Sequence, residues 1–377
     1  MQGRADGQPY RGSNHFAHLA AKTAHRFNIP DPIYVTMTTS LTPVRTVSWP
    51  LQRQYLVKPC PCGDPLMILS PQESRAAIAL CCCLLATHAL AEESAKFGEM
   101  MVESPVFDTA DKRLQPEYAT GFLLNSREID GMNLQAGHFT AFKNQDSASG
   151  KGNFFGYGAN TEAGGISFVG ADLFTQSPVG GALYASELTD TWNQYYGNLH
   201  FKQSEVFLDA NLYHTRDTGQ ALAGAIDNTA YSLSGRYTIG AHGFTLAYQK
   251  VDGDTPFDFV GGDSIYLANS IKYADFNGAR ERSWQVRYDL DLANVGIPGL
   301  KFMTRYVTGD QIDGTHAPQG GAYNPFDPAT GSFAPQQGDG GKHWERDIDL
   351  RYVVQSGAAK GLSLQLSHVS HLSLIHI

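Results

Sequence analysis

The sequence has no long apolar run, few charged residues and no cysteine after position 83. No apolar stretch reaches the roughly 18 residues that a membrane-spanning helix needs, which argues against an α-helical membrane protein. Only 17% of the residues are charged, and the formal net charge is -9. Because a nucleic-acid-binding protein carries a basic face, we expect no nucleic-acid partner.

The cysteine and aspartate patterns do not predict a metal site. A single residue separates the first two cysteines, and no second pair follows at the spacing of a zinc site. Three aspartates in one loop have a spacing unlike that of an EF-hand. We therefore expect no metal and no other cofactor. The residues concerned are Cys60, Cys62, Cys81, Cys82, Cys83, Asp252, Asp254 and Asp258.

Glycine and aromatic residues are plentiful, with 39 Gly, 18 Tyr and 20 Phe. This balance is typical of a β-barrel, which carries Tyr and Phe on its lipid face and at the membrane interfaces, and Gly in its turns. A soluble β-sandwich has a similar composition. The arrangement of the residues along the chain has to decide between them.

Apolar and polar residues alternate in many segments after position 91. In residues 283–292 one face carries Trp, Val, Tyr and Leu, and the other carries Gln, Arg and two Asp. Residues 301–308, 346–355 and 242–250 follow the same period of two, which predicts strands with an apolar outer face and a polar inner face. There are about a dozen such segments of the ~10 residues that a tilted strand needs to cross a bilayer. Tight links alternate with long loops, of which residues 309–342 are polar and expected outside.

Residues 67–91 read as a signal peptide. They contain one positive charge at Arg75, an apolar core at 76–86, and Ala89-Leu90-Ala91 before two glutamates. Small residues at the third and the first position before the cleavage point, here Ala89 and Ala91, followed by a polar segment, are typical of a signal-peptidase site. A buried helix of a soluble domain is the alternative interpretation.

Residues 1–66 show no sustained period, and we assign them no fold. Since a signal peptide stands at the true N-terminus, we interpret Met67 as the native start and residues 1–66 as upstream sequence mistakenly read as protein. Residues 92–377 are then the mature part of the protein.

Several long strings resemble the OprD family of substrate-specific porins, in one continuous order over about residues 96–366. They include FGEMMVESPVF, RLQPEYATGF, LYASELTDTWNQYY, GGDSIYLANSIKYADFNG and SWQVRYDLDLANVGIPGLKFMTRYVTGDQIDGT. The resemblance implies an all-β protein, a transmembrane antiparallel β-barrel of about 18 strands in the bacterial outer membrane. Its partners would be outer-membrane lipid and lipopolysaccharide, small solutes, and copies of itself in a homotrimer. The implied activity is selective diffusion of small carboxylate-bearing solutes: amino acids, small peptides and organic acids.

Two departures from the family pattern predict a partial barrel. Family members have a run of N-terminal strands where only four residues here separate Ala91 from Lys96. They also end in a closing strand with an apolar-aromatic tail, whereas this chain ends SHVSHLSLIHI. We therefore expect these 377 residues to lack N-terminal strands and the closing C-terminal strand. Because a barrel in lipid needs every strand edge paired, we do not expect them to close a native barrel alone.

The expected pore-lining residues are a set of arginines facing an acidic loop. Guanidinium suits this role because it stays charged and grips a carboxylate with two donors. The resemblance places Arg113, Arg305 and Arg351 in or near the family's ladder of basic residues. Alternation independently directs Arg305, Arg351 and Arg287 inward. The resemblance also matches Ser270 and Asp275 with a loop that folds into the barrel. The candidates are Arg113, Arg287, Arg305, Arg351, Ser270 and Asp275.

Each of these charges has a simpler interpretation as an ion pair that only stiffens the barrel. The family ladder is also incomplete here, since Gln365 and Ser367 stand where family members carry arginines.

Two other functions are open at this stage. A secreted serine peptidase could use His138, Asp190 and Ser264, but Ser264 lies in GGDSI and not in a Gly-x-Ser-x-Gly turn, and nothing indicates an oxyanion hole. A soluble secreted β-sheet protein could bind a ligand such as a carbohydrate through Trp192, Trp284 and Trp344. The outward faces carry Phe, Leu, Tyr and Val, which favours lipid. We therefore expect a porin and not an enzyme.

Overall fold

The computed structural model describes residues 33–38, 93–111, 115–154 and 164–374. The predicted signal peptide at 67–91 lies outside the described residues, and so does Arg113. No helix in the described part of the chain is long and apolar enough to cross a membrane.

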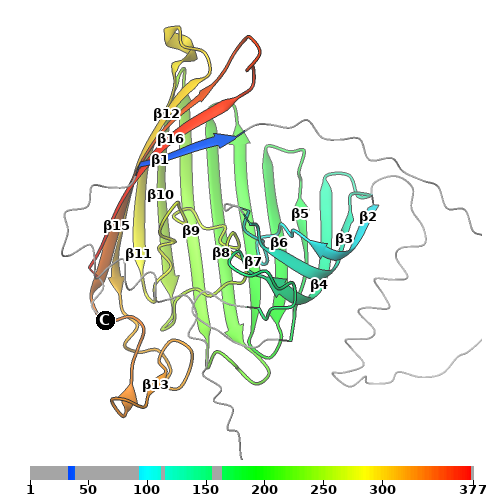
Figure 1. Ribbon diagram of the computed structural model, residues 1–377, viewed down its shortest axis with the longest axis vertical. Helices are drawn as coiled ribbons and strands as arrows, with labels where there is room; N and C mark the ends of the chain where they lie inside the picture. The colour runs from blue at the N-terminus through cyan, green and yellow to red at the C-terminus, as the bar shows by residue number, and fades with distance from the viewer. Residues whose placement is uncertain (1–32, 39–92, 112–114, 155–163, 375–377) are drawn as a thin grey trace, which may run out of the picture.

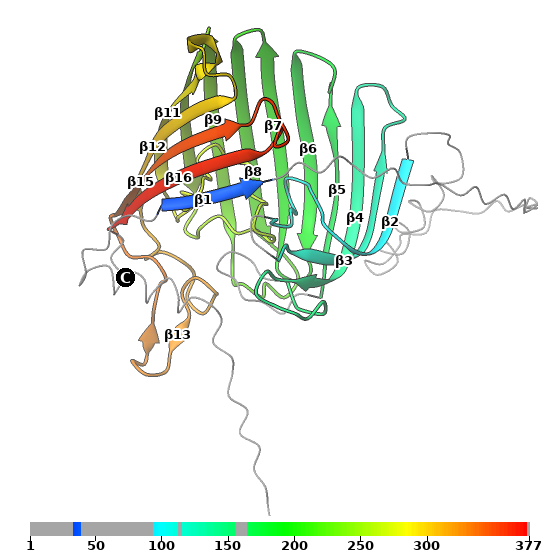
Figure 2. The ribbon, with the colours of Figure 1, turned by 45° about the horizontal axis from the view of Figure 1, so that its top comes forward.

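The described residues form one large antiparallel sheet of 14 strands and a separate small hairpin. The sheet order is β1-β16-β15-β12-β11-β10-β9-β8-β7-β6-β5-β4-β3-β2, so nearly all neighbours are also consecutive in the chain. The sheet curls into a trough with a concave and a convex face (Figure 1, Figure 2). The strands of the sheet are β1 (Ile33–Thr38), β2 (Glu93–Met100), β3 (Tyr118–Ser126), β4 (Met132–Lys143), β5 (Ile166–Leu173), β6 (Val179–Leu188), β7 (Trp192–Gln203), β8 (Val206–Asp217), β9 (Asp227–Ile239), β10 (His242–Asp252), β11 (Arg282–Asp291), β12 (Leu300–Ile312), β15 (Gly341–Val353) and β16 (Ser363–Ser373). The hairpin consists of β13 (Phe326–Asp327) and β14 (Ser332–Phe333), and a short 3₁₀ helix, η1 (Leu292–Val295), follows β11.

Strand β1 lies within residues 1–66, the segment to which we assigned no fold from the sequence. It pairs with β16 in antiparallel register, from Ile33 opposite His368 to Thr38 opposite Ser363. A strand of six residues is too short to show a sustained period of two, so the sequence did not predict it. Within the described residues, β1 and β2 are the two end strands of the sheet.

The predicted alternation decides which face each side chain occupies. On the convex face Val286 is 62% exposed and Leu246, its partner across the strands, 55%. Gln285, next to Val286 in the chain, is buried on the concave face. Tyr248 and Trp284 form an aromatic cross-strand pair on the convex face, with ring centroids 4.7 Å apart. An apolar convex face and a polar concave face are the pattern of a barrel wall in lipid.

The longest connections between the described strands lie at one end of the sheet. Strands β9 and β10 are joined by only two residues, and Gly240 there has a φ of +57°, the left-handed conformation that such hairpins require. At the other end, residues 101–111 and 253–281 fold back over the concave face (Figure 1). In outer-membrane barrels the longer loops are extracellular and the short turns periplasmic.

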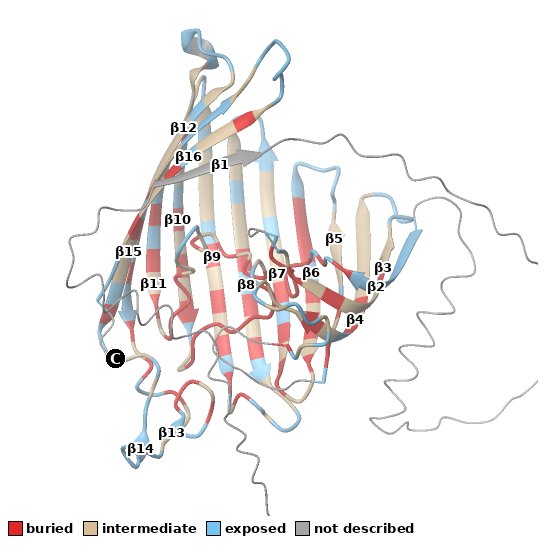
Figure 3. Cartoon of the chain, viewed as in Figure 1, coloured by how far each residue is buried: buried red, intermediate tan, exposed pale blue. Residues whose placement is uncertain are grey.

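These two inward segments fill part of the trough. Phe107 packs on Phe139 of β4 with ring centroids 5.3 Å apart, and both are fully buried. Tyr213 of β8 donates a hydrogen bond to the carbonyl of Pro105 at 2.8 Å and accepts one from the backbone of Tyr266 at 3.1 Å. Buried positions gather where the segments cross the sheet (Figure 3). The loops are therefore part of the packed interior.

A charge on the convex face should cost much more than the same charge on the concave face. We expect Val286→Arg to destabilise the folded state by about 2–4 kcal/mol, because Val286 lies midway along β11 on the lipid side. Met303→Arg is the matched control, since Met303 lies opposite Asp289 and Asp349 on the concave face. Urea titration of protein folded in liposomes measures the difference. Equal costs for the two variants would contradict the assignment of the faces.

Candidate pore constriction

Residues 253–281, which we call the constriction loop, are attached to the other inward segment near Asp108. The Asp108 backbone N–H donates to Ser264 Oγ at 2.6 Å, and the Tyr266 hydroxyl donates to Asp108 Oδ2 at 2.8 Å. Burial, followed by the nearby Asp108 carboxylate, raises the pKa of Tyr266, so this hydroxyl keeps its proton and remains a donor.

The middle of the loop is fixed by side-chain amides of the sheet. The Asn269 backbone N–H donates to Gln249 Oε1 at 2.8 Å, and its side-chain nitrogen donates to Ser283 Oγ at 2.8 Å. Gln285 donates to the carbonyl of Ala268 at 2.8 Å and to Asn269 Oδ1 at 3.1 Å. Buried backbone groups need partners, and here the polar residues of the concave face supply them.

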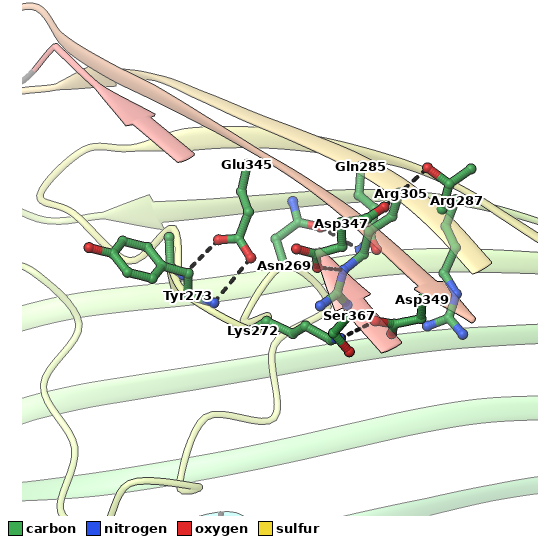
Figure 4. A network of polar contacts seen from close by, with 12 residues as sticks. Asn269, Lys272, Tyr273, Gln285, Arg287, Arg305, Glu345, Asp347, Asp349 and Ser367 are labelled. Carbon is green, nitrogen blue, oxygen red and sulfur yellow. Dashed lines mark hydrogen bonds and ion pairs between the residues drawn. The ribbon is translucent and has the colours of Figure 1, made fainter. Parts of the chain in front are cut away.

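The tip of the loop is held by acids of β15. The backbone N–H groups of Tyr273 and Ala274 donate to the Glu345 carboxylate at 3.0 and 2.8 Å (Figure 4). Lys272 forms an ion pair with Asp349.

The structure brings together the two residues expected on the acidic side of the pore. Ser270 Oγ donates to Asp275 Oδ1 at 2.8 Å. Gln249 donates to the carbonyls of Asp275 and Phe276 at 3.0 and 2.8 Å. Both predicted residues thus belong to the constriction loop, and their role in the pore stays a prediction.

The described arginines among the predicted residues each have a polar partner. Arg305 Nε donates to Asp347 Oδ2 at 2.5 Å, and the two side chains are 11% and 0% exposed. Arg287 lies opposite Arg305 in the strand register and pairs with Asp289 at 2.7 Å. Figure 4 shows Arg287 and Arg305 beside the tip of the constriction loop.

Arg351 lies farther along β15, where its Nε donates to Ser363 Oγ at 2.9 Å. The lining role of all these arginines stays a prediction.

Sequence reasoning missed the residues that hold the loop tip. Lys272 was not singled out, although it lies within the matched string of the loop. Its partner Asp349 is 77 residues away, and no local pattern connects them. Asp347 was visible as an acid on the inner face predicted for residues 346–355, but alternation alone does not say what it binds. Glu345 lies just before that predicted strand.

A polar cavity of about 1030 Å³ lies between the inward segments and the first strands of the sheet. Its lining contains more acids than bases among the described residues. The acids are Glu93, Glu103, Asp108, Asp111, Asp172 and Asp263, and the bases are Lys96 and Arg127. This half of the concave side therefore favours cationic groups. No group of three or more potential metal ligands occurs in the described ranges.

The three residues of the peptidase hypothesis have separate partners. His138 Nδ1 contacts Ser167 Oγ at 2.8 Å, while Ser264 is held by Asp108 as described above. Asp190 accepts a hydrogen bond from Gln220 at 3.4 Å. In a catalytic triad the histidine contacts both the serine and the aspartate, whereas these three residues are bonded to other partners.

The tryptophans do not form a binding surface either. Trp192 is fully buried and donates to Asp258 Oδ2 at 3.2 Å. Trp284 and Trp344 lie on the convex face, where each packs on a tyrosine of the next strand, at ring-centroid distances of 4.7 and 5.9 Å.

Comparison with known proteins points to a single family. Residues 86–375 match the model of the family described as "outer membrane porin, OprD family". Porin D of Pseudomonas aeruginosa is 43% identical over 290 residues, which cover 73% of this chain and 64% of that protein. Porin-like protein GalP of Pseudomonas putida is 32% identical over 277 residues, covering 72% and 61%. The chain thus spans less than two thirds of the length of these two relatives, both of which are named as porins, that is, channels and not enzymes.

Solved structures give the same result. The crystal structure of the outer-membrane protein OprD of Pseudomonas aeruginosa is similar with a TM-score of 0.64 at 39% identity, over 75% of this chain and 76% of that one. The structure of OpdK of the same organism, solved with vanillate, has a TM-score of 0.63 at 32% identity over 76% of both chains. On the strength of the family match, the relatives and the shared sheet, this chain belongs to the OprD family of outer-membrane porins, which are transmembrane β-barrels.

Proposed function

We propose that the chain forms a channel wall for passive diffusion of small carboxylate-bearing solutes such as amino acids, small peptides and organic acids. The observation that carries this proposal is the constriction loop, which crosses the concave face and is bound to it along its length. A loop held inside a barrel narrows the lumen, and a narrow lumen lets fixed charges act on a passing solute. We also propose export by the signal peptide at 67–91, contact with lipid and lipopolysaccharide on the convex face, and assembly as a homotrimer.

Charges of both signs on the concave side support zwitterionic and anionic solutes. Strand β11 carries Arg287, whose guanidinium group can bind a carboxylate with two donors, and strand β12 carries Arg305, which is paired with Asp347. The loop carries Asp275, and the charged residues that line the polar cavity are mainly acids, which suit an α-amino group. We propose as pore-lining residues Arg113, Arg287, Arg305, Arg351, Ser270 and Asp275. The vanillate bound to the related OpdK is itself a carboxylate, in line with this solute class.

The proposal is tested by single-channel recording of the full chain folded in detergent and inserted into a planar bilayer. We expect small, steady openings whose current falls when an amino acid or an organic acid is added, and stays the same with an uncharged sugar of similar size. A preparation that is folded, shown by heat-dependent migration on a gel, and yet gives no openings would overturn the proposal.

Removing the charge of Arg287 should weaken solute block. Its side chain is 31% exposed, so a solute can reach it. We expect Arg287→Gln to weaken block by a carboxylate about three- to tenfold, the factor that corresponds to the roughly 0.5–1.5 kcal/mol net contribution of one typical hydrogen bond. Arg282→Gln is the control, because alternation places Arg282 on the convex face. Equal effects of the two substitutions would contradict a lining role for Arg287.

Arg305 and Asp347 should behave as one buried pair. We expect Arg305→Gln to lower the free energy of unfolding by about 3–5 kcal/mol, because it leaves the Asp347 carboxylate buried without its cation. The double variant Arg305→Gln/Asp347→Asn should cost much less, since neither charge remains. Denaturant titration followed by tryptophan fluorescence, with Asp347→Asn as the other single variant, gives the three changes in the free energy of unfolding. Additive costs would show that the two groups do not depend on each other.

A further inference from the structure

Lys272 brings a positive charge from the constriction loop to the wall of the sheet. Its Nζ is paired with Asp349 of β15 and donates to Ser367 Oγ of β16 at 2.9 Å (Figure 4). Its side chain is 28% exposed and that of Asp349 14%. The pair is therefore held in place but remains within reach of solvent.

The wall itself supplies no charged neighbour directly opposite Asp349. In the strand register Asp349 lies between Met303 of β12 and Ser367 of β16, and neither side chain is charged. The preceding inward acid on β15, Asp347, has Arg305 opposite it on β12. Two successive acids of one strand are thus neutralised in different ways, one by the wall and one by the loop.

A second contact fixes the same part of the loop independently of Lys272. The two backbone N–H groups that follow it bind the buried Glu345 carboxylate. Because these two hydrogen bonds do not involve the Lys272 side chain, the tip should stay in place when Lys272 loses its charge. Charge and position can therefore be separated by experiment.

We propose that Lys272 is a specificity-determining residue of the channel, because it supplies the constriction with a cation that the solute carboxylate meets and at the same time neutralises Asp349. This inference rests on the proposed channel function. Lysine suits the task, since its compact ammonium has three donors and can exchange an acid of the wall for a carboxylate of the solute. The position on a loop places this cation in the lumen at a level where β16 presents only a serine.

The test uses reversal potentials in a salt gradient and block by a carboxylate, in planar bilayers with the full chain. Lys272→Gln should shift selectivity toward cations by roughly twofold or more, because Asp349 is left uncompensated. Asp349→Asn should shift it toward anions. The double variant Lys272→Gln/Asp349→Asn should return to the original reversal potential but keep the weakened carboxylate block. Lys272→Arg should preserve both properties.

Two controls make the outcome decisive. Lys360→Gln removes the same charge from the exposed turn between β15 and β16 and should change neither quantity. If Lys272→Gln also leaves both unchanged, or if the two single variants shift selectivity in the same direction, the inference is wrong. Absence of channels in the unsubstituted chain would instead contradict the proposed function, so the two failures are distinguishable.

Discussion

In hydrocarbon a backbone N–H or C=O group without a partner costs several kcal/mol, so a chain that crosses it as strands has to pair each strand with its neighbours. That constraint produces the long antiparallel ladder of this chain, in which nearly all neighbouring strands of the sheet are also consecutive in the chain. The ladder in turn fixes the direction of every side chain, because successive residues of a strand point to opposite faces. An apolar convex face and a polar concave face follow directly from it.

The backbone of the constriction loop also needs hydrogen-bond partners. Its backbone groups lie against the concave face, and they need partners that water cannot fully provide there. Gln249, Gln285 and Glu345 provide them. The polar residues of the inner wall therefore divide into those that satisfy the loop and those that remain for a solute. A count of inward polar residues, taken from the sequence, overestimates the second group.

Period and resemblance predicted the parts of the fold that depend on local pattern. The faces of residues 283–292 could be predicted because a strand of ten residues contains several repeats of the period. The resemblance placed Ser270 and Asp275 in one loop, and the structure joins them there by a hydrogen bond. By contrast, six residues at 33–38 contain too few repeats, and the pairing of Lys272 with Asp349 depends on how a long loop lies across the sheet. Contacts of this kind follow from tertiary packing, on which sequence periodicity gives no information.

The ion pairs decide whether an arginine on the inner wall is available to a solute. A guanidinium that is paired with a fully buried carboxylate, as Arg305 is with Asp347, is already neutralised and mainly holds two strands together. Arg287 and Lys272 are more exposed, so a solute can compete for them. The selectivity of such a lumen then depends less on the number of cations than on the free energy needed to separate each cation from its acidic partner. On that argument a cation carried by a loop, which can adjust without breaking the strand ladder, is the one best placed to exchange its partner for a passing carboxylate.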